Sequence, residues 1–205
     1  MTRELLVLSD LHLGTDRRGG TTPLSAAQLK GYLLSEFNDI LERHLDKDLL
    51  INGDLFDKFT EDDSTLKATF SILSNWLRKS GGHLYNVFGN HDKSARGDKL
   101  SSFDLLTFIL QEAFPDQVTG FEPELTKIKD GIWVIPHCMN TDLFELEVNK
   151  AVKTLGKGDK LFLHANVMNP FADDSDHSLN MTEEMCTNLV DKGVQLLFGH
   201  EHQWR

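Results

Sequence analysis

The sequence has little cysteine and no long apolar run. Its 205 residues include two cysteines, Cys138 and Cys186, which are too few and too far apart for a disulfide framework or a CxxC zinc knuckle. The first residues, MTRELLVLSD, hold only a short apolar run before an acid, so they predict neither a signal peptide nor a membrane span. We therefore expect a soluble, cytoplasmic protein with no membrane partner.

Basic residues are also scarce relative to acids. The chain has 21 Lys and Arg against 32 Asp and Glu, a formal net charge of -11. Proteins that coat duplex DNA rely on many contacts between Lys or Arg and phosphate, so this balance disfavours that class. It does not exclude phosphate chemistry, because bound metal ions supply local positive charge. With 40% hydrophobic residues, the composition is that of an ordinary globular domain.

Short apolar runs alternate with segments of helical periodicity, as is typical of a mainly parallel sheet covered by helices. Strands are expected at 5–9, 49–52, 84–88, 161–163 and 194–198, and helices at 25–45, 64–80, 102–114, 143–155 and 182–192. Ser64 is the expected N-cap of the second helix. Asp130-Gly131 predicts the turn of an antiparallel hairpin over 125–136. A hairpin between alternating units indicates two sheets rather than one.

The expected strands end in side chains of the kinds that bind metals. The motifs are Asp10-x-His12, Gly53-Asp54-x-x-Asp57, Gly89-Asn90-His91-Asp92, His164, and Gly199-His200-x-His202. Ligands bind at the carboxyl ends of strands in open α/β sheets, so these ends are expected to meet at one crevice. A lone DxH or HxH often arises by chance. The order and placement of the whole set indicate a site, and the glycines allow tight turns beside it.

The donors are too many for one ion. The predicted ligands are two carboxylates, four imidazoles and one amide oxygen, namely Asp10, Asp54, His12, His164, His200, His202 and Asn90. This set suits two divalent ions, with Asp54 bridging them. Mixed nitrogen and oxygen donors favour Mn²⁺, with Fe, Zn²⁺, Mg²⁺ or Ni²⁺ as alternatives. Two such ions would hold a hydroxide between them and clamp the oxygens of an in-line displacement at phosphorus.

The ordered motifs resemble those of the calcineurin-like metallophosphoesterase superfamily, from Asp10 to His202. The resemblance implies an α/β fold, a four-layered αββα sandwich of two mixed β-sheets flanked by helices. It implies a single domain over 1–205. Because closing strands usually follow the GHxH motif, we expect either a trimmed domain or an unusually compact protein.

The resemblance also implies roles for individual residues. The first ion would be held by Asp10, His12, Asp54 and His202, and the second by Asp54, Asn90, His164 and His200. His91 would contact the scissile phosphate and protonate the leaving oxygen, with Asp92 orienting it. Asp57 would hold a ligand histidine or the turn, or be purely structural.

The form of the motifs bears on the substrate. GNHD and GDLFD differ from the GNHE and GDxVDRG usual in protein serine/threonine phosphatases. They are similar to those of SbcD-like exonucleases and of phage and bacterial phosphodiesterases. The implied function is a phosphodiesterase or nuclease-type hydrolase that acts on a nucleotide or nucleic acid end. A phosphomonoesterase or a UDP-sugar pyrophosphatase-like hydrolase is the alternative among enzymes, although the pyrophosphatases commonly have arginine in place of His91. A nuclease-like subunit that serves as a binding module in a larger complex or oligomer is the alternative outside them.

Two basic loops are candidates for contact with substrate phosphate. Arg17 and Arg18 lie in the loop 14–23, and Lys93 and Arg96 lie in the loop 93–99. Each loop directly follows a metal-ligand motif. We therefore predict that these four side chains contact phosphate, the alternative being that both loops are simply solvated.

Overall fold

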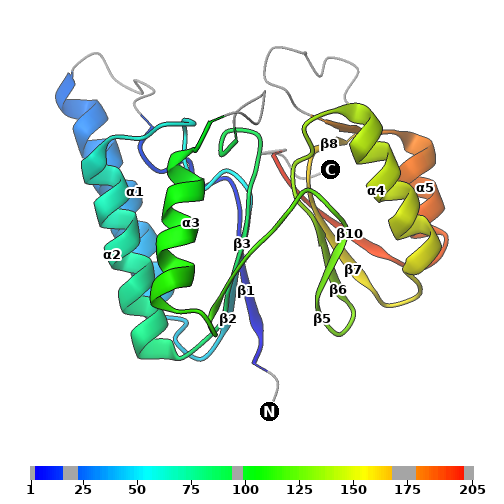
Figure 1. Ribbon diagram of the computed structural model, residues 1–205, viewed down its shortest axis with the longest axis horizontal. Helices are drawn as coiled ribbons and strands as arrows, with labels where there is room; N and C mark the ends of the chain where they lie inside the picture. The colour runs from blue at the N-terminus through cyan, green and yellow to red at the C-terminus, as the bar shows by residue number, and fades with distance from the viewer. Residues whose placement is uncertain (1–2, 16–22, 94–98, 168–178, 201–205) are drawn as a thin grey trace.

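The computed structural model describes residues 3–15, 23–93, 99–167 and 179–200. Two four-stranded sheets face each other between two layers of helices (Figure 1). The predicted four-layered α/β sandwich is therefore confirmed. No helix in the described ranges is both long and apolar enough to cross a membrane.

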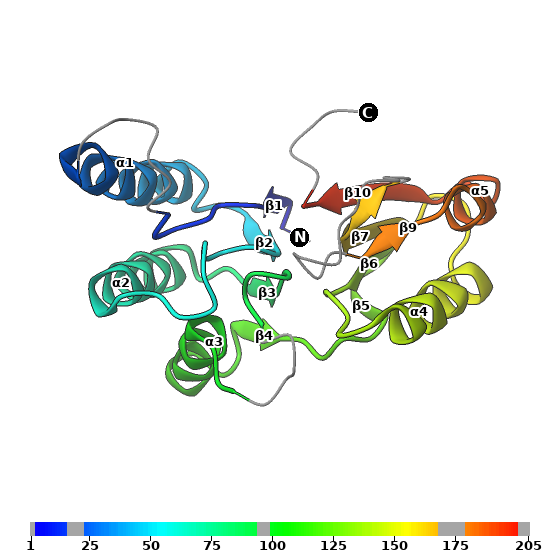
Figure 2. The same cartoon turned by 90° about the horizontal axis from the view of Figure 1, so that it is seen from above.

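The first sheet has the order β1-β2-β3-β4 and is parallel at every pairing. Its strands are β1 (Leu5–Leu8), β2 (Asp48–Asn52), β3 (Leu84–Val87) and β4 (Val118–Gly120). Its outer face is covered by α1 (Pro23–Glu42), α2 (Asp63–Ser80) and α3 (Ser102–Ala113), as Figure 2 shows from above. Phe37, Trp76 and Leu77 are fully buried in the core between this sheet and its helices.

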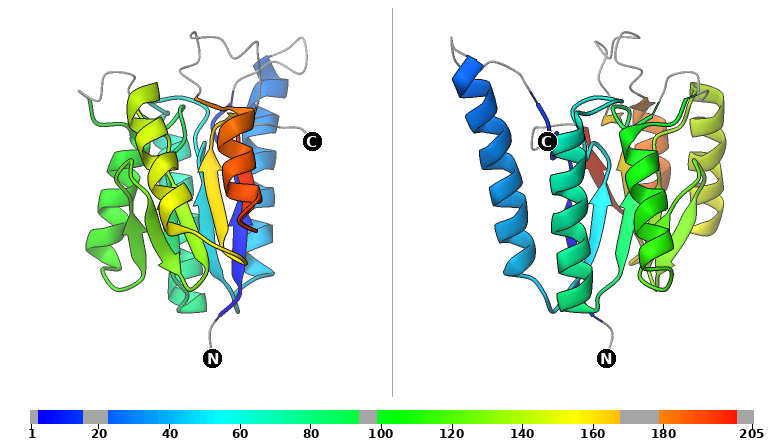
Figure 3. Two further views of the ribbon diagram at one scale, coloured as in Figure 1. Left: turned by 90° about the vertical axis from the view of Figure 1, so that its right-hand side faces the viewer. Right: turned by 60° about the vertical axis from the view of Figure 1, so that its left-hand side comes forward.

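The second sheet has the order β10-β7-β6-β5. Its strands are β5 (Thr126–Lys129), β6 (Ile132–Ile135), β7 (Lys160–His164) and β10 (Gln195–Gly199), and α4 (Thr141–Thr154) and α5 (Glu183–Val190) cover it. Figure 3 shows these two helices in front of the sheet in its left view. The β5–β6 pair is the predicted antiparallel hairpin, whereas the other pairs are parallel. A small parallel pair, β8 (Asn166–Val167) and β9 (Asn180–Met181), lies after β7.

The two sheets meet through the inner faces of their central strands. Leu50 and Val87 of the first sheet form one buried cluster with Val134 and Phe162 of the second. Every residue of β2 is buried, because helices cover one face of this strand and the second sheet covers the other. This packing holds the carboxyl ends of β2 and β7 at the same edge of the molecule.

Three details differ from the sequence-based expectation. The first sheet is wholly parallel, so only the second sheet is mixed. The strands β4, β8 and β9 were not predicted, because they are only three or two residues long and show no periodicity. The N-cap of α2 is Asp62 rather than Ser64, since a carboxylate oxygen of Asp62 accepts the Thr65 N–H at 2.9 Å. Ser64 lies inside the first turn and donates to Asp62.

Candidate metal centre

The ends of five strands from both sheets form the candidate centre. In Figure 1 the strands β1, β2, β3, β7 and β10 run toward the same edge. The turns after the first three carry Asp10, His12, Asp54, Asn90 and His91, while His164 ends β7 and His200 follows β10. Gly199 is the register partner of His164, so the two histidines of the second sheet come from adjacent strand ends.

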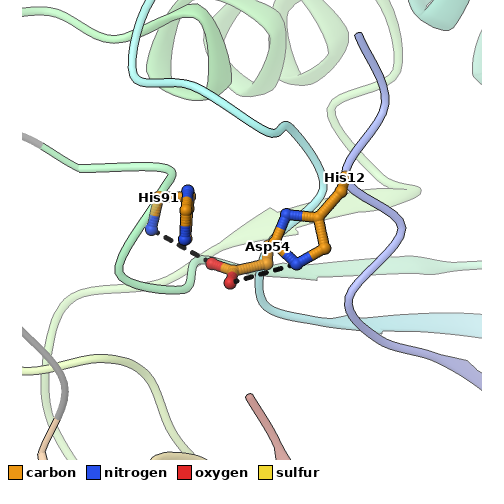
Figure 4. A group of neighbouring side chains, drawn as sticks. All are labelled: His12, Asp54 and His91. Carbon is orange, nitrogen blue, oxygen red and sulfur yellow. Dashed lines mark hydrogen bonds and ion pairs between the residues drawn. The ribbon is translucent and has the colours of Figure 1, made fainter. Parts of the chain in front are cut away.

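Asp54 lies at the middle of the centre and is 1% exposed. Its Oδ2 is 3.2 Å from His164 Nε2 and 3.8 Å from His12 Nε2. Its Oδ1 accepts the backbone N–H of His91 at 3.1 Å. Figure 4 shows the carboxylate between His12 and His91, and the two imidazoles meet edge to face with ring centroids 5.0 Å apart. One carboxylate thus faces imidazoles from both sheets.

Asn90 joins the two histidines of the second sheet. Its Oδ1 is 3.1 Å from His164 Nε2 and 3.1 Å from His200 Nδ1. The backbone N–H of His200 donates to Asp10 Oδ1 at 2.8 Å, and Ser9 Oγ donates to Asp10 Oδ2 at 2.6 Å. The donors of the second half of the chain are therefore tied directly to those of the first.

These side chains form two donor sets that share Asp54. The first set is His12, Asp54 and His91, and the second is Asp54, His164 and His200; within each, the ligand atoms lie within 4.8 Å of one another. Imidazole nitrogens and carboxylate oxygens are suitable donors for divalent transition metals. A carboxylate common to both sets could be shared by two adjacent ions. The residues thus fit the two divalent ions expected from the sequence.

The backbone at the centre adopts an uncommon conformation. Within the described ranges, the non-glycine residues with positive φ are Asp10 (54°), His12 (43°), Asp54 (51°) and His200 (80°). L-residues rarely occupy this left-handed region, and such strain occurs at functional sites more than elsewhere. All four residues were predicted as metal ligands. The sharp turns they make, after β1, β2 and β10, direct four side chains into one small volume.

Two glycines make room for the central pair, Asp54 and His164. A Cβ on Gly89 would stand 2.1 Å from Asp54 Oδ1, and a Cβ on Gly53 would stand 2.1 Å from His164 Nδ1. Gly53 also has φ +86°, which favours glycine. The expectation that these glycines allow tight turns beside the ligands is therefore confirmed.

The electrostatics of the centre couple Asp54 to His164. Burial acts to raise the pKa of Asp54, but the adjacent His164 and the His91 N–H outweigh it and hold that pKa well below its usual range. Burial acts to lower the pKa of His164, yet Asp54 raises it to about 9. Burial lowers the pKa of His12, despite the surrounding carboxylates. Without metal, the buried Asp54–His164 pair is thus ionic.

Comparison with known protein families assigns the chain to a family. The model of the calcineurin-like phosphoesterase family matches residues 4–204. The chain belongs to the calcineurin-like phosphoesterase family. No curated protein matches the sequence closely enough to name a relative. The family implies metal-dependent hydrolysis of phosphoesters, and the two donor sets of this phosphoesterase supply candidate ligands for the metal.

Most of the predicted ligands of the phosphoesterase lie together. The structure groups Asp10, His12, Asp54, Asn90, His164 and His200 at one edge. His202 lies outside the described residues, as do Arg17, Arg18 and Arg96. Metal binding by the predicted ligands, including His202, stays a prediction. Phosphate contact by the three arginines also stays a prediction.

The carboxylate of Asp92 binds backbone groups of two loops, and orientation of His91 by Asp92 stays a prediction. Its fully buried carboxylate accepts the backbone N–H groups of Gly89 (2.9 Å), Phe56 (3.2 Å) and Leu55 (3.3 Å). Burial, with the nearby charge of Asp54, raises the pKa of Asp92 to about 7. Asp92 therefore ties the loop after β2 to the loop after β3.

Asp57 contacts the ring of His91 through its backbone. Its backbone carbonyl is 2.7 Å from His91 Nδ1 and accepts the proton of that ring nitrogen. Its Oδ1 is 3.4 Å from His12 Nδ1, as expected of a carboxylate that supports a ligand histidine. The sequence could not show that Asp57 contacts His91, because the contact is made by a backbone carbonyl, which every residue has.

Lys93 is engaged within the protein. Its ammonium group forms an ion pair with Asp104 and lies 4.5 Å from the centre of the Phe88 ring. Asp104 also completes the capping box of α3 with Ser101. A contact between Lys93 and phosphate stays a prediction, and it would require Lys93 to leave or share Asp104.

Proposed function

We propose that the protein is a two-metal phosphodiesterase that acts on a nucleotide or a nucleic acid end, with Mn²⁺ as its metal. The observation that carries the proposal is His91, held beside the carboxylate that both donor sets share. The GNHD and GDLFD forms of the motifs support a diester rather than a phosphoprotein substrate. The free thiols of Cys138 and Cys186 support the proposed cytoplasmic location.

The residues divide the chemistry among them. Two divalent ions, when bound, polarise the phosphoryl oxygens and make water a better nucleophile. Asp10, His12, Asp54 and His202 would hold one ion, and Asp54, Asn90, His164 and His200 the other. His91 donates Nδ1–H to the Asp57 carbonyl, which leaves Nε2 to carry a proton to the leaving oxygen.

The test uses a model diester and separates catalysis from metal binding. Purified protein with Mn²⁺ should hydrolyse bis-p-nitrophenyl phosphate faster than p-nitrophenyl phosphate. His91→Ala should keep both ions and lose about 10²- to 10⁴-fold in turnover, the usual contribution of a general acid. The control is His44→Ala, because the His44 ring bonds to the Ile40 carbonyl near the end of α1 and is not part of either donor set. This variant should keep the wild-type rate.

Each other outcome has a meaning. If the metal-loaded protein hydrolyses neither substrate, the proposal is wrong. Faster turnover of the monoester would indicate a phosphomonoesterase. Loss of an ion in His91→Ala would make His91 a ligand, as its place in the first donor set allows. A screen of nucleotides, single-stranded and duplex DNA, and pyrophosphate-linked sugars would then define the substrate.

A further inference from the structure

Asn52 connects the two sheets at the edge that carries the metal centre. It is the last residue of β2, it is 2% exposed, and it directly precedes the Gly53-Asp54 turn. Its contacts reach the second sheet as well as β1. No sequence motif singles it out as a site residue.

The backbone carbonyl of Asn52 orients His164. It lies 3.0 Å from His164 Nδ1 and accepts the proton of that nitrogen. The other ring nitrogen, Nε2, then faces Asp54 Oδ2 at 3.2 Å and Asn90 Oδ1 at 3.1 Å. A hydrogen bond to one imidazole nitrogen fixes which nitrogen is left for a metal.

The side chain of Asn52 makes a second link to the same strand. Its Nδ2 donates to the backbone carbonyl of Leu163 at 3.1 Å, one residue before His164. Two successive residues of β7 are thus bound to one residue of β2, across the interface between the sheets. The carboxamide fixes the position of β7 along β2, and the backbone carbonyl of Asn52 then fixes the orientation of the His164 ring.

The same carbonyl also reaches the first donor strand. Ser9 Oγ lies 2.7 Å from the Asn52 carbonyl and 2.6 Å from Asp10 Oδ2. Gly199 lies close by, since a Cβ there would stand 2.6 Å from the Asn52 oxygen. The position thus contacts the supports of Asp10, His164 and His200 together.

We propose that Asn52 is a positioning residue of the second metal site, acting through the link of its carboxamide to Leu163. The inference rests on the two-metal centre of the proposed function, but not on the choice of substrate. Removal of the carboxamide lets β7 shift against β2 and misplaces His164 relative to Asp54. The expected effect falls on the ion held by Asp54, His164 and His200, and not on the ion held with His12.

Asn86 provides a matched control for this test. It lies on the neighbouring strand β3, it is fully buried, and its Nδ2 also makes one side-chain hydrogen bond, to Thr107 Oγ1 of α3 at 2.7 Å. Among the residues that the structure describes, none bonds the buried Oδ1 of either asparagine. Asn86 faces the helix layer, whereas Asn52 faces the second sheet. Asn52→Leu and Asn86→Leu therefore remove equivalent interactions on opposite faces of one sheet.

The experiment measures Mn²⁺ binding by calorimetry and the exchange-coupled Mn²⁺ pair by electron paramagnetic resonance. Asn52→Leu should weaken one of the two ions about 10- to 100-fold, the range found for residues that orient metal ligands, and should lose the coupled signal. Asn86→Leu should bind both ions as the wild type does. Urea unfolding should show comparable loss of stability in the two variants.

Several outcomes would overturn the inference. They are wild-type binding of both ions in Asn52→Leu, or equal weakening in Asn86→Leu. If Asn52→Leu does not fold, Asn52→Ala decides the matter by the same readouts, since it removes the carboxamide without adding bulk. A wild-type protein that binds two ions but cleaves no diester would overturn the proposed substrate and leave the role of Asn52 in place.

Discussion

At the scale of single residues, Asp54 links the two halves of the centre. It is the member common to both donor sets, and it forms the buried ion pair with His164. A metal ion must replace the proton on His164 to use that nitrogen, because only the neutral imidazole is a ligand. His12, whose pKa burial lowers, presents no such proton near neutral pH.

The two metal sites should therefore differ in their dependence on pH. The pKa of His164 is raised, so this group is protonated at pH 7 without metal and must release its proton on binding. Affinity for the second ion should rise with pH by up to about tenfold per unit between pH 6 and 8. Affinity for the first ion should rise less steeply. Calorimetry in buffers of different ionisation enthalpy counts the protons released.

His200→Ala serves as the control for this prediction. It removes a donor of the second set only, so the ion that still binds should show the shallow dependence. If the affinities of the wild type for the two ions rise equally with pH, the assignment of the raised pKa to the second site is wrong.

The residue types of the centre were predictable, whereas their partners were not. The spacing of Asp10 and His12, and the strand-end position of His164, are properties of sequence that the fold preserves. The roles of Asp57 and Asp92 depend on which backbone groups face them after two loops fold together. Asn52 acts partly through its backbone oxygen, which any residue possesses, and so gave no signal.

At the scale of elements, the turns after the strands determine the geometry of the centre. The loops after β2 and β3 are joined by the carboxylate of Asp92 and by the bond from the His91 N–H to Asp54. Gly89 lies between these links and directly against the carboxylate of Asp54. Space at this position is therefore as necessary as the ligands themselves.

Gly89→Ala should disrupt metal binding. The added Cβ would stand 2.1 Å from Asp54 Oδ1 and 2.5 Å from the Asp54 backbone nitrogen, so Asp54 must move. We expect about a 10-fold or greater loss of affinity for both ions, since both use Asp54. Gly156→Ala is the control, because nothing lies within 4 Å of the Cβ it would add. Metal titration followed by calorimetry compares the two, and unchanged affinity in Gly89→Ala would show that the loop can relax.

Long elements were predictable from sequence because they carry a period. The helices repeat apolar residues at a spacing of three or four, and the longer strands are recognised as short apolar runs. β4 was missed because three residues cannot show alternation, and it forms by pairing with β3 beneath α3. The N-cap at Asp62 was missed because Asp62, Asp63 and Ser64 are all good capping residues, and only the geometry of Thr65 selects one.

At the scale of the whole molecule, stability has a pH dependence that arises away from the metal centre. His83 precedes β3, its Nε2 is 2.8 Å from Thr119 Oγ1, and its ring lies against Tyr85 with centroids 4.5 Å apart. Burial, with the nearby Lys129, lowers the pKa of His83, and Asp48 opposes this only in part. The fold therefore prefers the neutral imidazole.

Acid should destabilise the wild type through this histidine. As the pH falls below the ordinary value of 6.5, the unfolded chain binds a proton that the folded protein does not, so the free energy of unfolding decreases. It decreases until the pH passes the lowered pKa of the folded state. Urea unfolding at pH 7.5 and 5.5, with chelator present, should show a larger loss in the wild type than in His83→Gln. Equal losses in both proteins would contradict this prediction.

The division of the donors between the sheets has a consequence for assembly. The first sheet and its helices use residues 5–120, and the second uses residues 126–199. The first donor set, His12, Asp54 and His91, lies wholly in the earlier segment, whereas the second set also needs His164 and His200. During synthesis, a chain that still lacks the later segment can bring together only the three donors of the first set, without the proposed ligand His202. Both proposed ions thus draw ligands from the later segment, so binding of the metal pair requires that both segments are present and packed against each other.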